Sequence, residues 1–154
     1  MSKYSKYKGK QSFAGYFLQF ISADGETKNV PATMIAIDGI SIIPDQITEK
    51  DAWRSDSDNS LHRKVFKEKK TSFKFTTIDD LPEYAMNYLI ETVMKNGLVK
   101  ADERKYRVKV WNPWKMDYQD TAMYYIPDTE FSISYRDSKG VIYYKGVTFE
   151  LIQY

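Results

Sequence analysis

Apolar side chains alternate with polar ones along four separate stretches of this 154-residue chain, and this pattern limits its fold more than any other feature. The stretches contain Phe73 and Phe75; Tyr106, Val108 and Val110; Phe131, Ile133 and Tyr135; and Val147, Phe149 and Leu151. Successive side chains of a strand point to opposite faces, so a period of two predicts strands with one buried face. The chain also holds thirteen tyrosines and eight phenylalanines, which favour strands over helices. We therefore expect a mainly β protein.

One helix is expected at about residues 80–96. Its apolar residues recur at helical spacing: Leu81, Tyr84, Ala85, Tyr88, Leu89 and Val93. Asp80 and Glu83 have the spacing of a capping box at its start, and Gly97 is a natural C-terminal stop.

Further strands are expected on both sides of this helix. Residues 13–22 are typical of a strand, and residues 30–43 of an extended stretch that Asp38-Gly39 divides into a hairpin. Ser138-Lys-Gly140 predicts a second hairpin near the C-terminus. Together the elements predict a β-sandwich or barrel of about eight strands with one flanking α-helix.

Composition indicates how the chain is organised. Residues 1–12 carry four lysines and no acid, which predicts a flexible basic arm, and residues 13–154 are expected to form a single β-sandwich domain. The net charge of +2 is too small to indicate nucleic acid or membrane by itself. The absence of cysteine excludes disulfides and thiolate metal sites. With no signal peptide and no apolar run long enough to span a bilayer, a soluble chain is expected.

Two neighbouring segments carry opposite charge. Residues 46–60 are polar and acidic with little periodicity, so we expect a long surface loop. Residues 61–74 hold six lysines and arginines against a single Glu68, and are expected to form a strand pair with one buried face. The acidic loop and the basic strand are able to pair between adjacent subunits.

The sequence offers few groups for catalysis. His62 is the only histidine, so two imidazoles of one subunit cannot share a metal ion, and we expect His62 at a surface or an interface. The acidic pairs Asp79-Asp80 and Asp102-Glu103 are better explained by a helix start and a polar turn than by acid–base catalysis. We expect no enzyme activity, no cofactor and no metal.

Binding of single-stranded nucleic acid is the alternative function. The basic run from Arg63 to Lys74 would supply the charge, and Phe66, Phe73 and Phe75 the stacking platforms. Strand alternation argues against it, because Lys74 would point to the face opposite Phe73 and Phe75.

Three segments carry a resemblance to a known group of proteins. They are Trp53–Val65 followed by Lys70–Phe75, then Tyr106–Asn112 with Tyr124–Glu130, and the C-terminal Val147–Tyr154. Over residues 13–154 the chain resembles a family of small uncharacterised proteins encoded in the tail modules of phages and prophages of Gram-positive bacteria. The order of strands and helix is also similar to the tail-tube fold, a β-sandwich with one flanking helix that forms hexameric rings.

The resemblance implies a structural protein of the virion tail, such as a tail-tube, distal-tail or tail-tip component, made in the cytoplasm of the host bacterium. Its partners would be copies of itself in a ring, such as a hexamer, and other tail proteins, with DNA only as passing cargo and no membrane. By analogy residues 46–60 would contact the next ring, and the basic arm would reach a neighbour. The candidate interface residues are Trp53, Arg54, Asp56, Asp58, His62, Arg63, Lys64, Lys67 and Lys70.

Overall fold

The computed structural model describes residues 3–47, 49–65 and 67–154 and shows a mainly β protein with antiparallel sheets. The strands are β1 (Leu18–Ile21), β2 (Thr27–Asn29), β3 (Ile35–Gln46), β4 (Glu49–Arg54), β5 (Leu61–Val65), β6 (Lys70–Thr77), β7 (Leu81–Pro82), β8 (Leu98–Lys100), β9 (Lys105–Asn112), β10 (Asp117–Tyr118), β11 (Ala122–Tyr125), β12 (Ile133–Arg136), β13 (Ile142–Tyr144) and β14 (Thr148–Gln153). The helical elements are α1 (Glu83–Tyr88), a π-turn η2 (Leu89–Val93), and the 3-10 turns η1 (Ala32–Met34), η3 (Met94–Gly97) and η4 (Ala101–Glu103).

Most strands belong to one large antiparallel sheet. Its order is β2-β1-β9-β11-β14-β6-β3, with β8 and β10 also paired to β9, so β2 and β3 lie at its two ends. A small sheet of order β12-β13-β7 and the separate pair β4-β5 complete the strands of the described residues. The fourteen strands exceed the eight expected because several are only two or three residues long, below the length at which alternation is detectable.

The predicted alternation is confirmed in the central strands. In β6, Thr71, Phe73, Phe75 and Thr77 are buried while the intervening side chains are more exposed. Phe75 lies directly opposite Phe149 of β14, and their rings stack with centroids 5.2 Å apart. These two strands therefore contribute one apolar face to the core.

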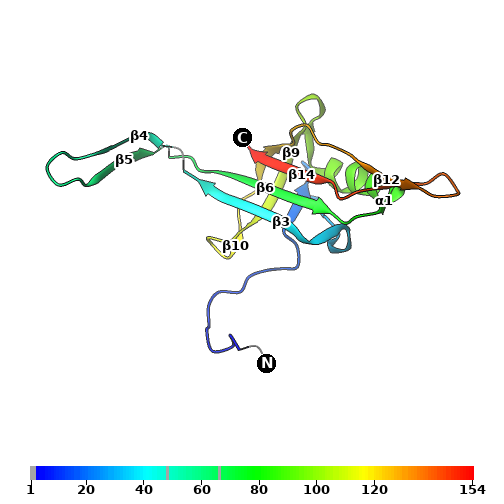
Figure 1. The fold of residues 1–154 in the computed structure, drawn as a ribbon, viewed down its shortest axis with the longest axis horizontal. Coiled ribbons are helices and arrows are strands. Elements are labelled where there is room, and N and C mark those ends of the chain that lie inside the picture. The colour runs from blue at the N-terminus through cyan, green and yellow to red at the C-terminus, as the bar shows by residue number, and fades with distance from the viewer. Residues whose placement is uncertain (1–2, 48, 66) are drawn as a thin grey trace.

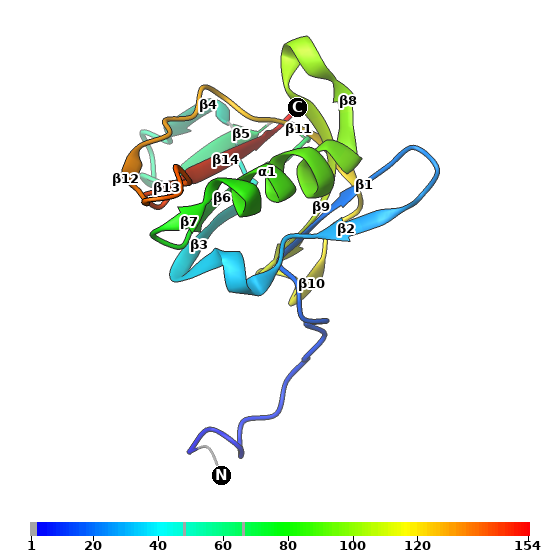
Figure 2. The same ribbon diagram turned by 90° about the vertical axis from the view of Figure 1, so that its right-hand side faces the viewer.

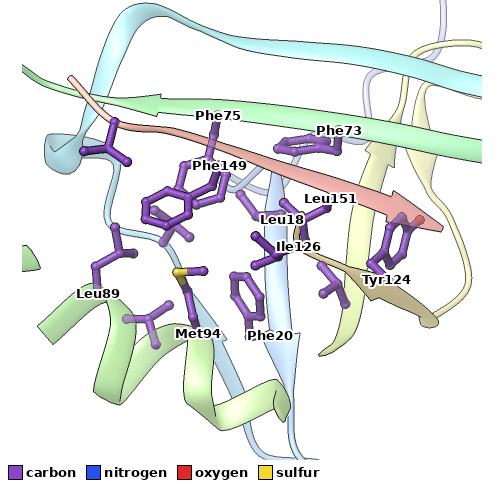
Figure 3. Close-up of a cluster of buried hydrophobic side chains, with 14 of the residues drawn as sticks. Leu18, Phe20, Phe73, Phe75, Leu89, Met94, Tyr124, Ile126, Phe149 and Leu151 are labelled. Atoms are coloured by element: carbon purple, nitrogen blue, oxygen red, sulfur yellow. The ribbon is translucent and has the colours of Figure 1, made fainter. Parts of the chain in front are cut away.

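The predicted helix is confirmed as a helical segment that runs from α1 through η2 and η3. It lies across the concave face of the curved sheet (Figure 2). Met86, Leu89, Val93 and Met94 are its buried side chains, and Figure 3 shows Leu89 and Met94 directed toward the cluster that contains Phe20. The apolar face of the helix and the apolar face of the sheet therefore pack into the same core.

The capping box predicted at Asp80 and Glu83 is wrong. The helix begins after Pro82, which makes no side-chain cap, and Asp80 adopts a left-handed conformation with φ 60°. Asp80 instead accepts a hydrogen bond from Ser134 Oγ at 2.6 Å, and Glu83 one from the Ile142 amide at 3.4 Å. Both carboxylates hold the small sheet against the start of the helix.

The hairpin predicted at Asp38-Gly39 is also wrong, because β3 runs through these residues as one strand with a register shift between Ile35 and Ile40. A Cβ atom at position 39 would lie 2.7 Å from the Thr76 carbonyl oxygen of β6. The glycine therefore permits a close approach of two backbones, rather than a turn.

Three further predictions need correction. Residues 46–60 are not a loop, because Glu49–Arg54 form β4. The basic residues 61–74 do form two strands, but β5 is exposed throughout and only β6 has a buried face. Phe131, Ile133 and Tyr135, expected on a buried face, are exposed at the small sheet.

The N-terminal segment leaves the body and extends away from it (Figures 1 and 2). Described residues 3–12 are mostly exposed, and the strand expected at residues 13–22 is limited to β1. Lys10 Nζ lies 2.9 Å from Asp117 Oδ2, and the Tyr118 hydroxyl donates to the Tyr16 carbonyl oxygen at 2.7 Å. These contacts fix where the segment leaves the body. None of the helices in the described part of the chain has the length and apolar character needed to cross a bilayer.

Candidate protein-interaction site

The β4–β5 hairpin, called the arm here, projects from one end of the molecule (Figure 1). It continues the ribbon of β3 and β6, whose last paired residues are Gln46 and Lys70. Asp45 adopts a left-handed conformation with φ 50° at the register shift just before this point. The ribbon therefore leaves the sheet at an irregular position.

The acidic segment and the basic strand pair with each other inside one subunit. In the register of β4 and β5, Ala52 faces Arg63, Trp53 faces His62 and Arg54 faces Leu61. The structure therefore pairs β4 with β5 within one chain, and contact of these segments with an adjacent subunit stays a prediction.

The tip of the arm is a compact polar turn. The Asn59 amide donates to the Ser55 carbonyl oxygen at 2.8 Å, and the Ser55 amide to the Ser60 carbonyl oxygen at 2.9 Å. Asp58 Oδ1 accepts from both the amide and the hydroxyl of Ser60. These hydrogen bonds hold the pKa of Asp58 below its usual value, the backbone contribution being the larger. Asn59 supplies the left-handed residue, with φ 58°.

One face of the arm combines aromatic and cationic side chains. The rings of Trp53 and His62 stack with centroids 5.2 Å apart and planes at 11°. Lys64, two residues from His62 and on the same face, has its ammonium group 6.0 Å from the indole centroid. Such amphipathic rings are enriched at protein interfaces.

The other face combines aliphatic and cationic side chains. It presents Leu61, Arg63 and Val65 from β5 together with Arg54 from β4. Leu61 is 52% exposed and Val65 is 41% exposed, so this face does not pack on the body of its own subunit. An arm with apolar side chains exposed on both faces is suited to contact another molecule.

The structure brings together most of the residues predicted as interface candidates. Trp53, Arg54, Asp56, Asp58, His62, Arg63 and Lys64 lie on the arm or its turn. Asp58 has a role in the turn, which sequence reasoning missed. Lys67 is exposed in the connection to β6, and Lys70 lies at the base, 3.3 Å from Glu68 and bonded to the Tyr154 carbonyl oxygen.

The groups weighed for catalysis are dispersed over the molecule. His62 is on the arm, Asp79 accepts a hydrogen bond from the Gly146 amide, and Glu103 pairs with Lys100 at 3.1 Å. Among the residues that the structure describes, no group of three or more His, Asp or Glu side chains is placed to hold a metal ion.

The nucleic-acid alternative loses two of its three predicted stacking platforms. Phe73 and Phe75 are fully buried in the core, so neither ring is available to a base. Phe66 lies outside the described residues. Trp53 is instead the exposed ring beside the basic strand.

Comparison with known families identifies the chain at the level of family. A family model described as "Family of unknown function (DUF6711)" matches residues 11–154. The chain belongs to this family. No curated protein matches it. The DUF6711 match includes the arm and the whole sheet, and it begins one residue after Lys10.

Proposed function

We propose that the protein is a structural subunit of a bacteriophage tail, a tail-tube, distal-tail or tail-tip component that assembles with copies of itself and with other tail proteins. In this proposal it works in the virion, by protein contacts and without catalysis. Its sheet and helix act as a tail-tube-like sandwich body, and its neighbours in the assembly form a ring such as a hexamer.

The arm is the observation that supports the proposal most. Isolated two-stranded hairpins are marginally stable in water, yet this one exposes Trp53, Leu61 and Val65 instead of covering them with its own body. Burial of such side chains against a neighbour would supply apolar contact area and order the hairpin. In an assembly, an arm of this kind would supply apolar contact area to a neighbouring subunit.

The ends of the large sheet offer a second means of contact. β3 lies at one end, is twelve residues long and carries Ile37 fully exposed, while the short β2 lies at the other. Unpaired strand edges are templates for pairing with another chain. Side-by-side pairing of sheet edges would therefore close subunits into a ring, and the arm would be left to reach beyond it.

The test of this function is the size of the pure protein in solution. Light scattering after size exclusion is expected to give masses that are multiples of 18.1 kDa, and electron micrographs to show rings or tubes. A strict monomer at high concentration that binds no other tail protein would contradict the proposal. Immunogold labelling of phage particles, with tails labelled or bare, tests the tail location directly.

A single-stranded nucleic-acid module remains the second candidate, because Trp53 and Lys64 share one exposed face. It requires binding to a labelled oligonucleotide that weakens steeply as salt rises and is lost in Trp53→Ala. A structural subunit is expected to give a flat titration at low salt.

A further inference from the structure

Polar side chains meet beneath the arm, beside the last paired residues of β3 and β6. They are Asp45 of β3, Thr71 of β6, Asn112 of β9 and Gln119 after β10, and we call these four residues the base cluster. Asn112, Thr71 and Gln119 are buried, and Asp45 is half-buried. Buried polar side chains are rare among the residues that the structure describes, so their concentration beneath the arm requires a physical reason.

The backbone of Asp45 is held in a conformation that costs free energy. Its φ of 50° lies in the left-handed region, which a residue with a Cβ atom adopts only at a cost, although aspartate tolerates it better than most. Such a conformation persists where the surrounding contacts fix it. The Asp45 amide donates to Thr71 Oγ1 at 3.2 Å, at the register shift between Ile43 and Gln46. The base cluster thus fixes the point at which the ribbon bends.

The side chain of Asn112 reaches the same point from β9. Asn112 Nδ2 donates to Asp45 Oδ2 at 2.8 Å, and Asn112 Oδ1 accepts from the Trp114 amide at 2.9 Å. Both ends of the Asn112 amide are therefore bonded, which determines its orientation. β9 and β3 are not neighbours in the large sheet, so this bond ties the end strand to a strand with which it does not pair.

The second strand of the ribbon is tied down at the same level. Gln119 Nε2 donates to Thr71 Oγ1 at 2.8 Å, and the Thr71 amide donates to Gln153 Oε1 at 2.9 Å. Thr71 follows Lys70, which forms the last β3–β6 pair with Gln46. Both strands are therefore anchored to the body immediately before the arm begins.

We infer that Asn112 is a positioning residue for the arm: through the carboxylate of Asp45 it fixes the direction in which the arm projects from the body. Without this bond the ribbon bends at Asp45 and the arm pivots. The inference goes beyond the proposed function, because it concerns how a single subunit holds its arm. An arm held in one direction loses less conformational freedom when it contacts another molecule.

The natural absence of cysteine allows a direct measurement of the arm's direction. Nitroxide labels at Asp56→Cys in the turn of the arm and at Val99→Cys in β8, both exposed, give the distance between arm and body by pulsed electron paramagnetic resonance. An excess of unlabelled protein restricts the measured distances to one chain. β4 has six residues. It is thus about 20 Å long, and a pivot of about 15° would move the label by about 5 Å.

The labelled protein is expected to show one narrow distance peak, and the loss of the bond to displace or broaden it. Asn112→Ala removes the donor, so its peak should move or widen by about 5 Å or more. Asp45→Asn keeps a side-chain oxygen that accepts the bond and tolerates the left-handed backbone, so its peak should stay unchanged.

A second pair of variants tests the acceptor. Asp45→Gly removes the carboxylate and permits a positive φ, so it breaks the same bond without backbone strain. The matched control is Gln46→Gly at the next residue, which loses only the hydrogen bond from Gln46 Nε2 to Ser72 Oγ, within the β3–β6 pair. The peak should widen in Asp45→Gly and remain narrow in Gln46→Gly.

The outcomes decide the inference. An unchanged narrow peak in Asn112→Ala, with a native circular-dichroism spectrum, would overturn it. If Asn112→Ala does not fold, the glycine pair decides: an unchanged peak in Asp45→Gly, or equal widening in Gln46→Gly, would overturn the role of the bond. Widening in Asp45→Gly alone supports it.

The same samples separate the inference from the proposed function. Light scattering of the unlabelled wild-type protein measures assembly, which the peak width does not report. A monomer whose peak widens in Asp45→Gly alone would contradict the proposed assembly and support the positioning role. An oligomer whose peak is the same in all variants would do the reverse.

Discussion

Trp53 and His62 occupy directly opposite positions of the arm, and their rings stack with centroids 5.2 Å apart on a two-stranded ribbon that is separate from the large sheet. The stack is half open to solvent, with Trp53 46% exposed. Such a pair stabilises the ribbon locally and still leaves ring area for a neighbour.

Trp53→Ala is expected to reduce assembly while leaving the body intact. Because Trp53 stacks on His62 in an arm that projects from the body, the melting temperature of the body should change by no more than about 2 °C. Light scattering measures the loss of oligomer, and thermal unfolding followed by circular dichroism measures the stability of the body.

The matched control is Trp114→Ala, which removes another tryptophan, 80% exposed, from the turn after β9. It is expected to leave both assembly and melting temperature unchanged. Equal loss of assembly in the two variants would show that the effect is not specific to the arm.

Gly39→Ala is expected to destabilise the fold by about 1–3 kcal/mol. The added methyl group would lie 2.7 Å from the Thr76 carbonyl oxygen, so β3 and β6 must separate. Urea denaturation gives the free energy of unfolding. Gly9→Ala is the control, since nothing lies within 4 Å of that position, and it should have no effect.

Gly39 also shows which part of the fold the sequence predicts. Alternation identifies strands such as β6, β9 and β14 because burial of one face creates the pattern. The pair Asp38-Gly39 has the residue types of a hairpin turn, but the same glycine serves a close approach of two strands. Local sequence does not distinguish these uses.

The sequence did not predict the arm as a hairpin, because its strands lack the alternation that burial of one face creates. β5 is exposed throughout and pairs only with β4, so neither of its faces requires apolar residues and no period of two develops. Its residues were nevertheless identified as interface candidates through their charge and their resemblance to a tail-module family. The exposure of Ile133 and Tyr135 in β12 had no such signal, because the alternation of these residues predicts a buried face.

The turn of the arm is expected to respond to pH through Asp58. Its pKa is lowered by the hydrogen bonds from Ser60, so their contribution is complete above the unfolded-state pKa of about 3.9 and is lost as pH falls through the lower folded value. The NMR shift of the Ser60 amide should therefore titrate with a midpoint below about 3.9.

Asp58→Asn provides the control for this titration, because its side-chain oxygen still accepts a hydrogen bond but does not ionise. The pH-dependent shift of Ser60 should disappear in this variant. A Ser60 midpoint at or above the usual aspartate value in the unchanged protein would show that the turn is not formed in solution.

Tyr124→Phe is expected to stabilise the protein by about 1 kcal/mol or to leave it unchanged. The ring of Tyr124 is fully buried, and its hydroxyl has no hydrogen-bond partner among the described residues. Desolvation, with a smaller contribution from the charge of Asp45, raises the pKa of this hydroxyl far above its usual range. Removal of the hydroxyl oxygen therefore removes the free-energy cost of burying an unpaired polar group and breaks no hydrogen bond.

Tyr118→Phe is the matched control. The Tyr118 hydroxyl donates to the Tyr16 carbonyl oxygen and accepts from the Ala14 amide, so its loss should lower the free energy of unfolding in urea by about 1 kcal/mol. Equal destabilisation in both variants would show that the Tyr124 hydroxyl is hydrogen-bonded in solution.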